Sequence, residues 1–370
     1  MDVVIVGAGT FGGSLAWWLA REGHGVTLVD QFEPGDRRAS SGGETRLLRC
    51  AHGEDADYTA MARRARTLWR ELEAESDEDL FVECGYAWFA RRDDGWEAAS
   101  EPVLAAQGIP AERLDVAEVA GLYPTFRGDG LAFVLLEPEA GVLRAERSVR
   151  TLAAQAAAHG ARILRTRAVP NGRAAVLEDG TRLEGDVVVW ACGPWLGTLF
   201  PDLVTLKVTR QEPLFLDGGP AWRAPLPAWC DYDAGRWGSA DIDGLGVKAA
   251  IDEDGPPVDP DAELTGEALT EPQVRAYLRE RFPALGDAPL LRTHACRYEI
   301  TPDTHFIAAP HPEQPGVWIV GGGSGHGFKH GPALAERIVA ALEGRAELPP
   351  HFALGERPNS RNLRTRGDGD

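Results

Sequence analysis

The lysines of this chain are few, and two of them stand where a bound ligand could use them. Only three lysines occur in 370 residues, although lysine and arginine together number 38. Lys248 ends the run GLGVK and Lys329 ends GSGHGFK. Glycine lets a backbone approach a ligand closely, and a compact ammonium does work that a planar guanidinium does not. Both lysines are therefore candidates for chemistry beside a bound group, although codon bias with chance survivors would leave the same pattern.

A second group of chemical residues is the glycine run GAGTFG at residues 7–12, which separates an apolar strand-like run from an apolar helix-like run. Gly7, Gly9 and Gly12 allow a tight turn, close approach of a pyrophosphate and close packing of helix on strand. The helix N-terminus adds N–H donors and a positive dipole. Asp30 ends the next strand-like run and can accept hydrogen bonds from ribose hydroxyls. The spacing predicts a dinucleotide site and does not separate FAD from NAD.

Two further glycine corners favour a flavin. DVVVWACGPW brings a strand to Gly193 and Trp195, and GVWIVGGGSGHGFK ends a strand in a turn that opens a helix. An NAD domain rarely needs a distant C-terminal glycine turn, whereas an isoalloxazine extends beyond the nucleotide. A helix N-terminus at that place can stabilise negative charge on a reduced ring.

With these motifs in place, the chain resembles the D-amino-acid-oxidase-like flavoproteins, and within them the monomeric sarcosine oxidase and N-methyltryptophan oxidase group. The similarity covers most of the chain. The matching segments are VVIVGAGTFGGSLAWWLA, SGGETRLLRCAHGED, WACGPW, GLGVK, CRYEITPDTHFI and GGGSGHGFK. The resemblance implies an FAD domain and a sheet-based substrate domain that covers the flavin.

The resemblance also assigns roles to single residues. Cys296 matches the cysteine that links covalently to the flavin 8α-methyl group, and Lys248 matches the lysine near flavin N5 that activates oxygen. Arg46 matches the arginine that lies against the flavin. Arg49 and Lys329 match the pair that grips the substrate carboxylate, an arrangement suited to charge-assisted hydrogen bonds. The remaining matches are the pocket residue Tyr298 and the cofactor turn Gly323, Ser324, Gly325, His326, Gly327, Phe328 and Lys329.

Each of these residues also has an ordinary structural interpretation. Cys296 could be a small buried hydrophobe, Lys248 a solvated surface lysine, and Tyr298 a core aromatic. Arg46 and Arg49 could share one exposed face of a helix turn.

Three positions depart from the family pattern. A histidine at the start of the arginine segment is replaced by Ser41, a pocket tyrosine by Trp237, and a pocket histidine by Asp252. The flavin and oxygen machinery is thus kept while the substrate wall is changed, which puts sarcosine itself in doubt as the substrate. A carboxylate at position 252 could attract a second amine or simply face water.

The elements that position these residues read as an α/β protein. We predict strands at residues 3–7, 26–30 and 186–191 and helices at 13–21, 56–75, 146–160 and 271–281, with a hairpin turning at Asp179-Gly180. Residues 80–140 look irregular. We expect a Rossmann-like FAD domain of residues 1–80, 142–205 and 305–356, and an inserted mixed-sheet substrate domain of residues 81–141 and 206–304. Residues 357–370 read as a flexible tail.

Composition narrows the remaining choices. A net charge of −19 argues against nucleic acid or an anionic membrane surface as the main partner. No apolar run reaches the length needed to span a bilayer. Five widely spaced cysteines fit free thiols in a reducing cytoplasm. The nine histidines show no metal-ligand spacing, so no metal is predicted, and we expect a monomer or homodimer.

The sequence therefore predicts an FAD-dependent amine oxidase. It would convert a secondary amine or amino acid that bears a carboxylate, sarcosine-like, N-alkyl or cyclic, into an imine while O2 becomes H2O2. One alternative is a biosynthetic tailoring oxidase or desaturase of a larger or cyclic amino-acid intermediate. Others are a flavin dehydrogenase that passes electrons to a carrier, and a flavin-binding subunit whose partner completes the site.

Overall fold

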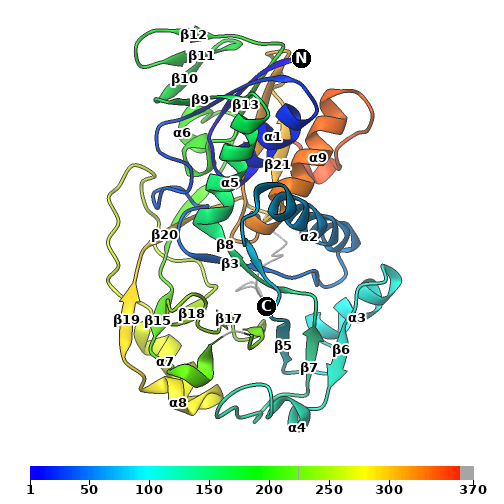
Figure 1. The fold of residues 1–370 in the computed structure, drawn as a ribbon, viewed down its shortest axis with the longest axis vertical. Coiled ribbons are helices and arrows are strands. Elements are labelled where there is room, and N and C mark those ends of the chain that lie inside the picture. Colours follow the sequence, from blue (N-terminus) through cyan, green and yellow to red (C-terminus); the bar gives the residue numbers. More distant parts are fainter. Residues whose placement is uncertain (224, 359–370) are drawn as a thin grey trace.

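A six-stranded sheet forms the upper half of the molecule in Figure 1. The computed structural model describes residues 1–223 and 225–358. The strand order is β21-β22-β13-β1-β2-β9, parallel throughout except for β21 at the edge. The inner strands read as continuous runs of Val, Ile and Leu, as expected for strands covered on both faces. The strands are β1 (Asp2–Val6), β2 (Gly25–Asp30), β9 (Arg162–Arg165), β13 (Val187–Trp190), β21 (Ile307–Pro310) and β22 (Val317–Gly321).

Three helices pack together beside this sheet. The central one, α1 (Thr10–Arg21), contacts α5 (Ala145–Ala158) and α9 (Gly331–Leu342). All but its last residue are buried. A Cβ atom at Gly331 would lie 2.6 Å from Thr10 Oγ1, so a glycine is required where α9 begins against α1. The predicted helices at 13–21 and 146–160 and the parallel strand pair are confirmed.

The predicted hairpin is also present, as part of a small three-stranded sheet. Its strands are β10 (Ala168–Asn171), β11 (Ala174–Leu177) and β12 (Arg182–Leu183). Gly180 has φ +83° at the turn, and the backbone N–H of Thr181 donates to Asp179 Oδ1 at 2.8 Å.

The lower half holds an eight-stranded mixed sheet (Figure 1). Its order is β19-β15-β18-β17-β16-β5-β7-β6. Residues 80–140, which look irregular in sequence, supply three of these strands and helix α3 (Trp96–Ala106). All five residues of β5 are buried, which removes the alternation that marks a strand, and Pro102 lies inside α3. The strands are β5 (Tyr86–Ala90), β6 (Glu112–Leu114), β7 (Phe133–Glu137), β15 (Leu214–Leu216), β16 (Ala228–Asp231), β17 (Arg236–Ser239), β18 (Val247–Ile251) and β19 (Leu290–Thr293).

Two small antiparallel sheets complete the strand structure and carry site residues. One joins β3 (Thr45–Leu48), β8 (Gly141–Arg144) and β4 (Phe81–Val82). The other pairs β14 (Lys207–Gln211) with β20 (Cys296–Ile300). The remaining helices are α2 (Ala56–Ser76), α4 (Val116–Val119), α6 (Leu196–Leu199), α7 (Glu271–Arg281) and α8 (Pro283–Gly286).

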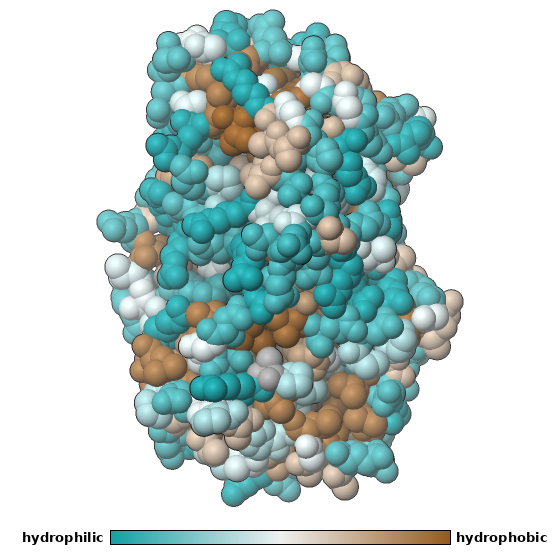
Figure 2. All heavy atoms as spheres, viewed as in Figure 1, coloured by the Kyte–Doolittle hydropathy of each residue, from teal (hydrophilic) through white to brown (hydrophobic). Residues whose placement is uncertain are grey.

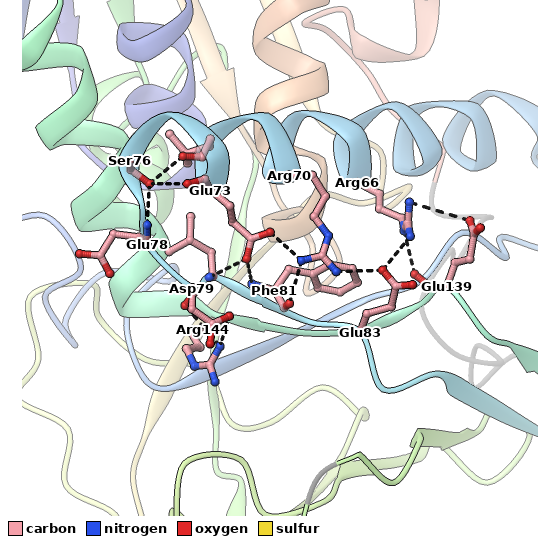
Figure 3. Close-up of polar contacts among 12 residues, drawn as sticks. Arg66, Arg70, Glu73, Ser76, Glu78, Asp79, Phe81, Glu83, Glu139 and Arg144 are labelled. Carbon is pink, nitrogen blue, oxygen red and sulfur yellow. Dashed lines mark hydrogen bonds and ion pairs between the residues drawn. The ribbon is translucent and has the colours of Figure 1, made fainter.

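Helix α2 is tied to the β4 segment by an arginine and glutamate network, shown in Figure 3. Glu73 accepts hydrogen bonds from the backbone N–H groups of Leu80 and Phe81 at 2.8 and 2.7 Å. Arg66 and Arg70 both bond Glu83. Exposed pairs of this kind stabilise little individually, but the backbone bonds fix where the chain leaves α2.

The strands of the two large sheets divide along the predicted domain lines, and the boundaries themselves stay a prediction. Every strand of the six-stranded sheet falls within 1–80, 142–205 or 305–356, and every strand of the eight-stranded sheet falls outside them. Arg357, at the start of the predicted flexible tail, bonds Asp303 Oδ1 at 2.9 Å. Positions 359–370 lie outside the described residues.

On the face in Figure 2 hydrophilic residues predominate, and the larger hydrophobic areas lie in the lower half. None of the described helices has the length and apolar character to traverse a bilayer.

Candidate active site

A long cleft runs beside the carboxyl ends of β1, β2 and β13. Its empty volume is about 1100 Å³, part of it open to solvent. Three separate stretches of sequence meet there, namely the first glycine turn, the corner after β13 and the glycine turn after β22. Predicted site residues that line it are Gly7, Gly9, Asp30, Ser41, Arg46, Gly193, Trp195, Tyr298, Gly323, Gly325, Gly327 and Phe328.

The first glycine turn has the geometry that its spacing predicts. Gly7 has φ +107°, and a Cβ there would lie 2.3 Å from the carbonyl oxygen of Ala191. A Cβ at Gly12, which does not line the cleft, would lie 1.9 Å from the carbonyl oxygen of Gly7. Gly9 differs, because its Cβ would meet only Ser41 Oγ, at 3.1 Å. Gly7 and Gly12 thus serve the fold, while Gly9 keeps the cleft open at the start of α1.

Asp30 is held in place by the turn it faces. Its carboxylate accepts hydrogen bonds from the backbone N–H groups of Ala8 at 2.6 Å and Phe32 at 2.8 Å. Burial raises the pKa of Asp30, and these two bonds oppose that rise. A carboxylate has about four acceptor positions, so two remain for hydroxyl groups in the cleft.

The C-terminal glycine turn divides its residues between the cleft and the protein interior. Gly323, Gly325 and Gly327 line the cleft. Ser324 does not, and its Oγ donates to the carbonyl oxygen of Gly322 at 2.9 Å. His326 also lies away from the cleft, with Nε2 2.9 Å from the carbonyl oxygen of Thr304. Their predicted cofactor contacts stay predictions. Ser324 Oγ also accepts the backbone N–H of Thr301 at 3.2 Å, so both residues hold the turn against neighbouring segments.

Lys248 is almost fully buried, at 3% exposure, and its ammonium is hydrogen-bonded to Thr45. Its Nζ donates to the backbone oxygen of Thr45 at 2.9 Å and to Thr45 Oγ1 at 3.2 Å. The Nζ atom also lies 5.2 Å from the ring centroid of Trp237 and 5.6 Å from that of Phe215. Burial, followed by the charge of Arg46, lowers the pKa of Lys248 to about 7. An ordinary surface lysine is thereby excluded.

Cys296 lies in the electrostatic field of the same cations. It is a free cysteine at the start of β20. Burial raises the pKa of its thiol, while the charges of Arg46 and Lys248 lower it. The thiolate is the reactive form of cysteine, and these two cations offset part of the effect of burial, while the pKa of the thiol stays above its usual value. The structure thus brings together the predicted tether and the predicted oxygen-activating lysine.

Arg46 is fixed by backbone oxygens. Its guanidinium donates to the carbonyl oxygens of Thr45, Ser40 and Gly42 at 2.7–2.8 Å, and it lies 5.7 Å from the ring of Phe328. It lines the cleft. Because β3 is a strand, Arg46 and Arg49 do not share a helix face.

Arg49 and Lys329 form a second buried pair of cations, 8% and 3% exposed. Arg49 donates to the carbonyl oxygen of Ala51 at 2.5 Å and packs 5.1 Å from the ring of Trp88. Lys329 donates to the carbonyl oxygen of His326 at 2.9 Å. Burial lowers the pKa of Lys329 well below its usual value, and Arg49 lowers it further. Among residues 1–223 and 225–358, no carboxylate forms an ion pair with either cation.

The three altered positions lie in different settings. Ser41 lines the cleft, and Trp237 faces Lys248. Asp252 follows β18, and its charge opposes the fall in the pKa of Lys329. Asp252, at the position where the family pattern has a histidine, is therefore close enough for its charge to act on Lys329.

Two acidic residues of the site are not among those that the sequence predicts. Glu299 is buried, lines the cleft and accepts the backbone N–H of Gly323 at 3.2 Å. Glu44 pairs with Arg37 at 3.0 Å, and its charge acts on Lys248. Glu299 sits inside CRYEITPDTHF and alternates with Tyr298 along β20, which is a usable signal. Nothing in the sequence links Glu44 to Lys248, 204 positions away.

The residues present fit an FAD, because the cleft joins a dinucleotide turn to a second glycine turn. A Cβ at Gly193 would meet nothing within 4 Å, so the cleft wall is open there, whereas one at Gly9 would lie 3.1 Å from Ser41 Oγ. Residues 2–342 match the family described as FAD dependent oxidoreductase (DAO). The chain belongs to this family, which confirms the predicted fold class and the predicted oxidoreductase class.

Individual relatives narrow the comparison. The chain is 29% identical to monomeric sarcosine oxidase of Bacillus sp. (strain B-0618), covering 94% of this chain and 93% of that protein. It is 31% identical to N-methyl-L-tryptophan oxidase of Yersinia pestis (strain Pestoides F), covering 94% and 96%. The structure of L-proline dehydrogenase from P. horikoshii aligns with a TM-score of 0.83 at 21% identity, covering 94% and 95%. The sequence relatives confirm the resemblance, and the solved structure supports the fold.

Proposed function

We propose that the protein oxidises a secondary amine or amino acid that bears a carboxylate to an imine, with O2 reduced to H2O2. The observation that carries this proposal is the pair of buried cations, Arg49 and Lys329, without an ion-pair partner among the described residues. A buried unpaired charge costs several kcal/mol, on the order of the penalty for removing an ion from water. A substrate carboxylate bound between these two side chains would offset that cost.

The carboxylate clamp would orient the substrate. Arg49 is held by the carbonyl oxygen of Ala51 and the ring of Trp88, so its guanidinium is positioned before the substrate binds. Lys329 is held by the carbonyl oxygen of His326. Two fixed donors on one carboxylate leave little freedom to the attached amine, and such positioning supplies much of the catalytic effect.

The FAD would lie along the cleft, with Gly7, Gly9 and Asp30 at its dinucleotide part and Arg46, Tyr298 and Phe328 farther along. When bound, it supplies the acceptor for the hydride equivalents of the amine. We infer that Cys296 tethers it covalently. The support is that Cys296 lies in the field of Arg46 and Lys248, whose charges oppose the rise in the pKa of its thiol that burial causes.

Lys248 would act on oxygen. Two of its three N–H bonds are committed to Thr45, which leaves one to point elsewhere. An ammonium held in a water-poor site stabilises negative charge as it develops on O2. Because the pKa of Lys248 is about 7, this side chain carries a charge in roughly half of the molecules at neutral pH.

The altered residues of the predicted substrate pocket favour a substrate other than sarcosine. Trp237 and Asp252 stand where the family pattern has a tyrosine and a histidine. A bulkier indole beside Lys248 and a carboxylate near Lys329 change both the shape and the charge of the pocket. This observation also favours the second candidate, a tailoring oxidase or desaturase that acts on a larger or cyclic amino-acid intermediate.

A peroxide assay over a substrate panel tests the proposal. The panel compares sarcosine, proline, pipecolate and bulky N-alkyl amino acids, each beside the matching amine without a carboxylate. We expect turnover only of carboxylate-bearing compounds. Equal turnover of the decarboxylated partners would remove the role of the clamp.

Electron acceptors separate the oxidase from the remaining alternatives. The L-proline dehydrogenase of P. horikoshii shares this fold, so a dehydrogenase that uses a carrier is a third candidate. Chemically reduced enzyme mixed with air-saturated buffer should reoxidise quickly, and slow reoxidation would favour the dehydrogenase.

Gel filtration of the lone chain, assayed for peroxide, tests whether a partner must complete the site. We further infer a cytoplasmic monomer or homodimer that binds no nucleic acid, in keeping with the net charge of −19.

A further inference from the structure

Three histidines from distant parts of the chain meet in the interior beside the carboxylate clamp. His52 precedes α2, His326 lies in the glycine turn after β22, and His330 stands at the N-terminus of α9. They are 2%, 6% and 0% exposed. One ring nitrogen from each lies within 4.8 Å of the others. We propose that His52, His326 and His330 bind a first-row transition metal ion, with Zn²⁺ as the representative ion.

The hydrogen bonds around the cluster set two of the rings for coordination. His52 Nδ1 lies 2.8 Å from the carbonyl oxygen of Cys50, and His326 Nε2 lies 2.9 Å from that of Thr304. A carbonyl only accepts, so these nitrogens carry the hydrogen and the lone pair stands on the other nitrogen of each ring. Metal-binding histidines almost always have such a carbonyl or carboxylate partner, which fixes the tautomer.

The remaining nitrogens support a ligand at this place. Within the described part of the chain, His52 Nε2 and both ring nitrogens of His330 are buried without a hydrogen-bond partner. Buried polar groups are normally satisfied, and each exception requires an explanation. A bound ion would satisfy His52 Nε2 and one of the two ring nitrogens of His330.

The distances are compatible with coordination. Zinc–nitrogen bonds of about 2.0–2.1 Å in a tetrahedral site place ligand nitrogens about 3.3–3.4 Å apart. From a separation of at most 4.8 Å, each ring would need to move by no more than about 0.8 Å to reach that bond length. Imidazole suits zinc, copper, iron and nickel, whereas Mg²⁺ and Ca²⁺ prefer oxygen ligands.

Two features of the surroundings shape the properties of this three-histidine site. Arg49 and Lys329 act electrostatically on His52, so they oppose a dication and the affinity should be lower than for an isolated three-histidine site. The site would also connect the start of α2, the turn after β22 and the start of α9. A bound ion would therefore stabilise the segment that carries Lys329. The sequence gives no sign of the site because His52 lies 274 positions before His326.

Metal stoichiometry of the purified flavin-loaded chain tests the proposal. Protein without a histidine tag is treated with chelator, equilibrated with Zn²⁺, desalted and analysed by mass spectrometry for metal. Wild type should retain about one zinc ion per chain. His52→Phe and His330→Phe should lose most of that metal while keeping the flavin absorbance. His24→Ala is the matched control, because it removes the one histidine from the group of Glu22, His24 and Glu343 and should not change retention.

Two further measurements cover a variant that folds poorly. The unfolding temperature of wild type should rise with added Zn²⁺, and that of His52→Gln should not. With Co²⁺ in place of Zn²⁺, wild type should develop visible ligand-field absorption that His52→Gln lacks. Zinc retention equal in wild type and both phenylalanine variants, or absent from all three, would overturn the proposal and leave His52, His326 and His330 as buried core residues.

Discussion

Lys248→Met should slow the reaction with oxygen while leaving the earlier half of the cycle nearly intact. Methionine is also unbranched, is one atom shorter and carries no charge. An ammonium 4 Å from a developing negative charge, at an effective dielectric constant of about 20, stabilises it by about 4 kcal/mol. That energy corresponds to a rate factor of about a thousand.

The pH dependence of this factor follows from the pKa of Lys248. Burial and Arg46 lower that pKa to about 7, so the amine is charged below pH 7 and loses its charge as pH rises. The oxygen rate of wild type should therefore be constant below about pH 6 and fall about tenfold per pH unit above 8. The rate of Lys248→Met should be independent of pH over this range.

Stability supplies a check that the variant is folded. A lysine whose pKa falls from 10.5 to about 7 on folding destabilises the folded state by about 5 kcal/mol below pH 7. The penalty shrinks as pH rises from 7 toward 10.5, because only the unfolded chain then keeps the proton. Removing the charge relieves it, so Lys248→Met should not unfold at a lower temperature than wild type at pH 6.

The assay is stopped-flow reoxidation of chemically reduced enzyme by O2, which needs no knowledge of the substrate. Lys207→Met is the matched control, because Lys207 is the third lysine and its side chain is half exposed beside Asp254. The control should reoxidise at the wild-type rate. An oxygen rate for Lys248→Met within threefold of wild type at pH 6 (about 0.7 kcal/mol) would refute the role of the ammonium.

Four other substitutions test neighbouring parts of the site. Cys296→Ala should release its flavin into the supernatant on acid precipitation, whereas the wild-type pellet should stay yellow; a colourless wild-type pellet would disprove the tether. Glu44→Gln should move the pH at which the oxygen rate falls to a lower value, because Glu44 raises the pKa of Lys248; an unchanged profile would show that Glu44 has no influence. Gly12→Ala should destabilise the fold by about 1–3 kcal/mol through overpacking. Gly9→Ala should change stability by less than about 0.5 kcal/mol and instead weaken FAD binding, and equal flavin occupancy in Gly9→Ala and wild type would contradict this.

The sequence predicts well the parts of this protein that depend on neighbours in the chain. Gly7, Gly12 and Asp30 are set by one βαβ unit, in which turn geometry and helix packing leave few alternatives. The hairpin at Asp179-Gly180 is equally local, since Gly180 supplies the positive φ that the turn requires. Such features need no knowledge of the rest of the fold.

Features that depend on the meeting of distant segments were not predicted from spacing. Strand β5 is buried along its whole length because β16 and β7 flank it and other elements cover both faces, and no alternation marks it. The hydrogen-bond partner of Lys248 is Thr45, 203 positions earlier. The family resemblance indicates the role of Lys248 but not this partner. The histidine cluster likewise needs three segments to converge, so only the structure shows it.

The clamp itself can be tested by exchanging one cation for another. Arg49 lies 5.1 Å from the ring of Trp88 and 5.9 Å from that of Trp96, and it bonds the carbonyl oxygen of Ala51. A lysine keeps the charge but offers neither the planar stack nor the two-pronged contact with a carboxylate. Arg49→Lys should therefore raise KM with a smaller change in kcat, and kcat/KM should fall about tenfold to a hundredfold, the worth of one charged hydrogen bond of about 1.5–3 kcal/mol. Arg150→Lys, on the exposed face of α5, should be neutral. If Arg49→Lys retained the wild-type kcat/KM for a carboxylate substrate, a positive charge alone would be enough for substrate binding. The planar guanidinium of Arg49, packed beside Trp88 and Trp96, would then have no part in it.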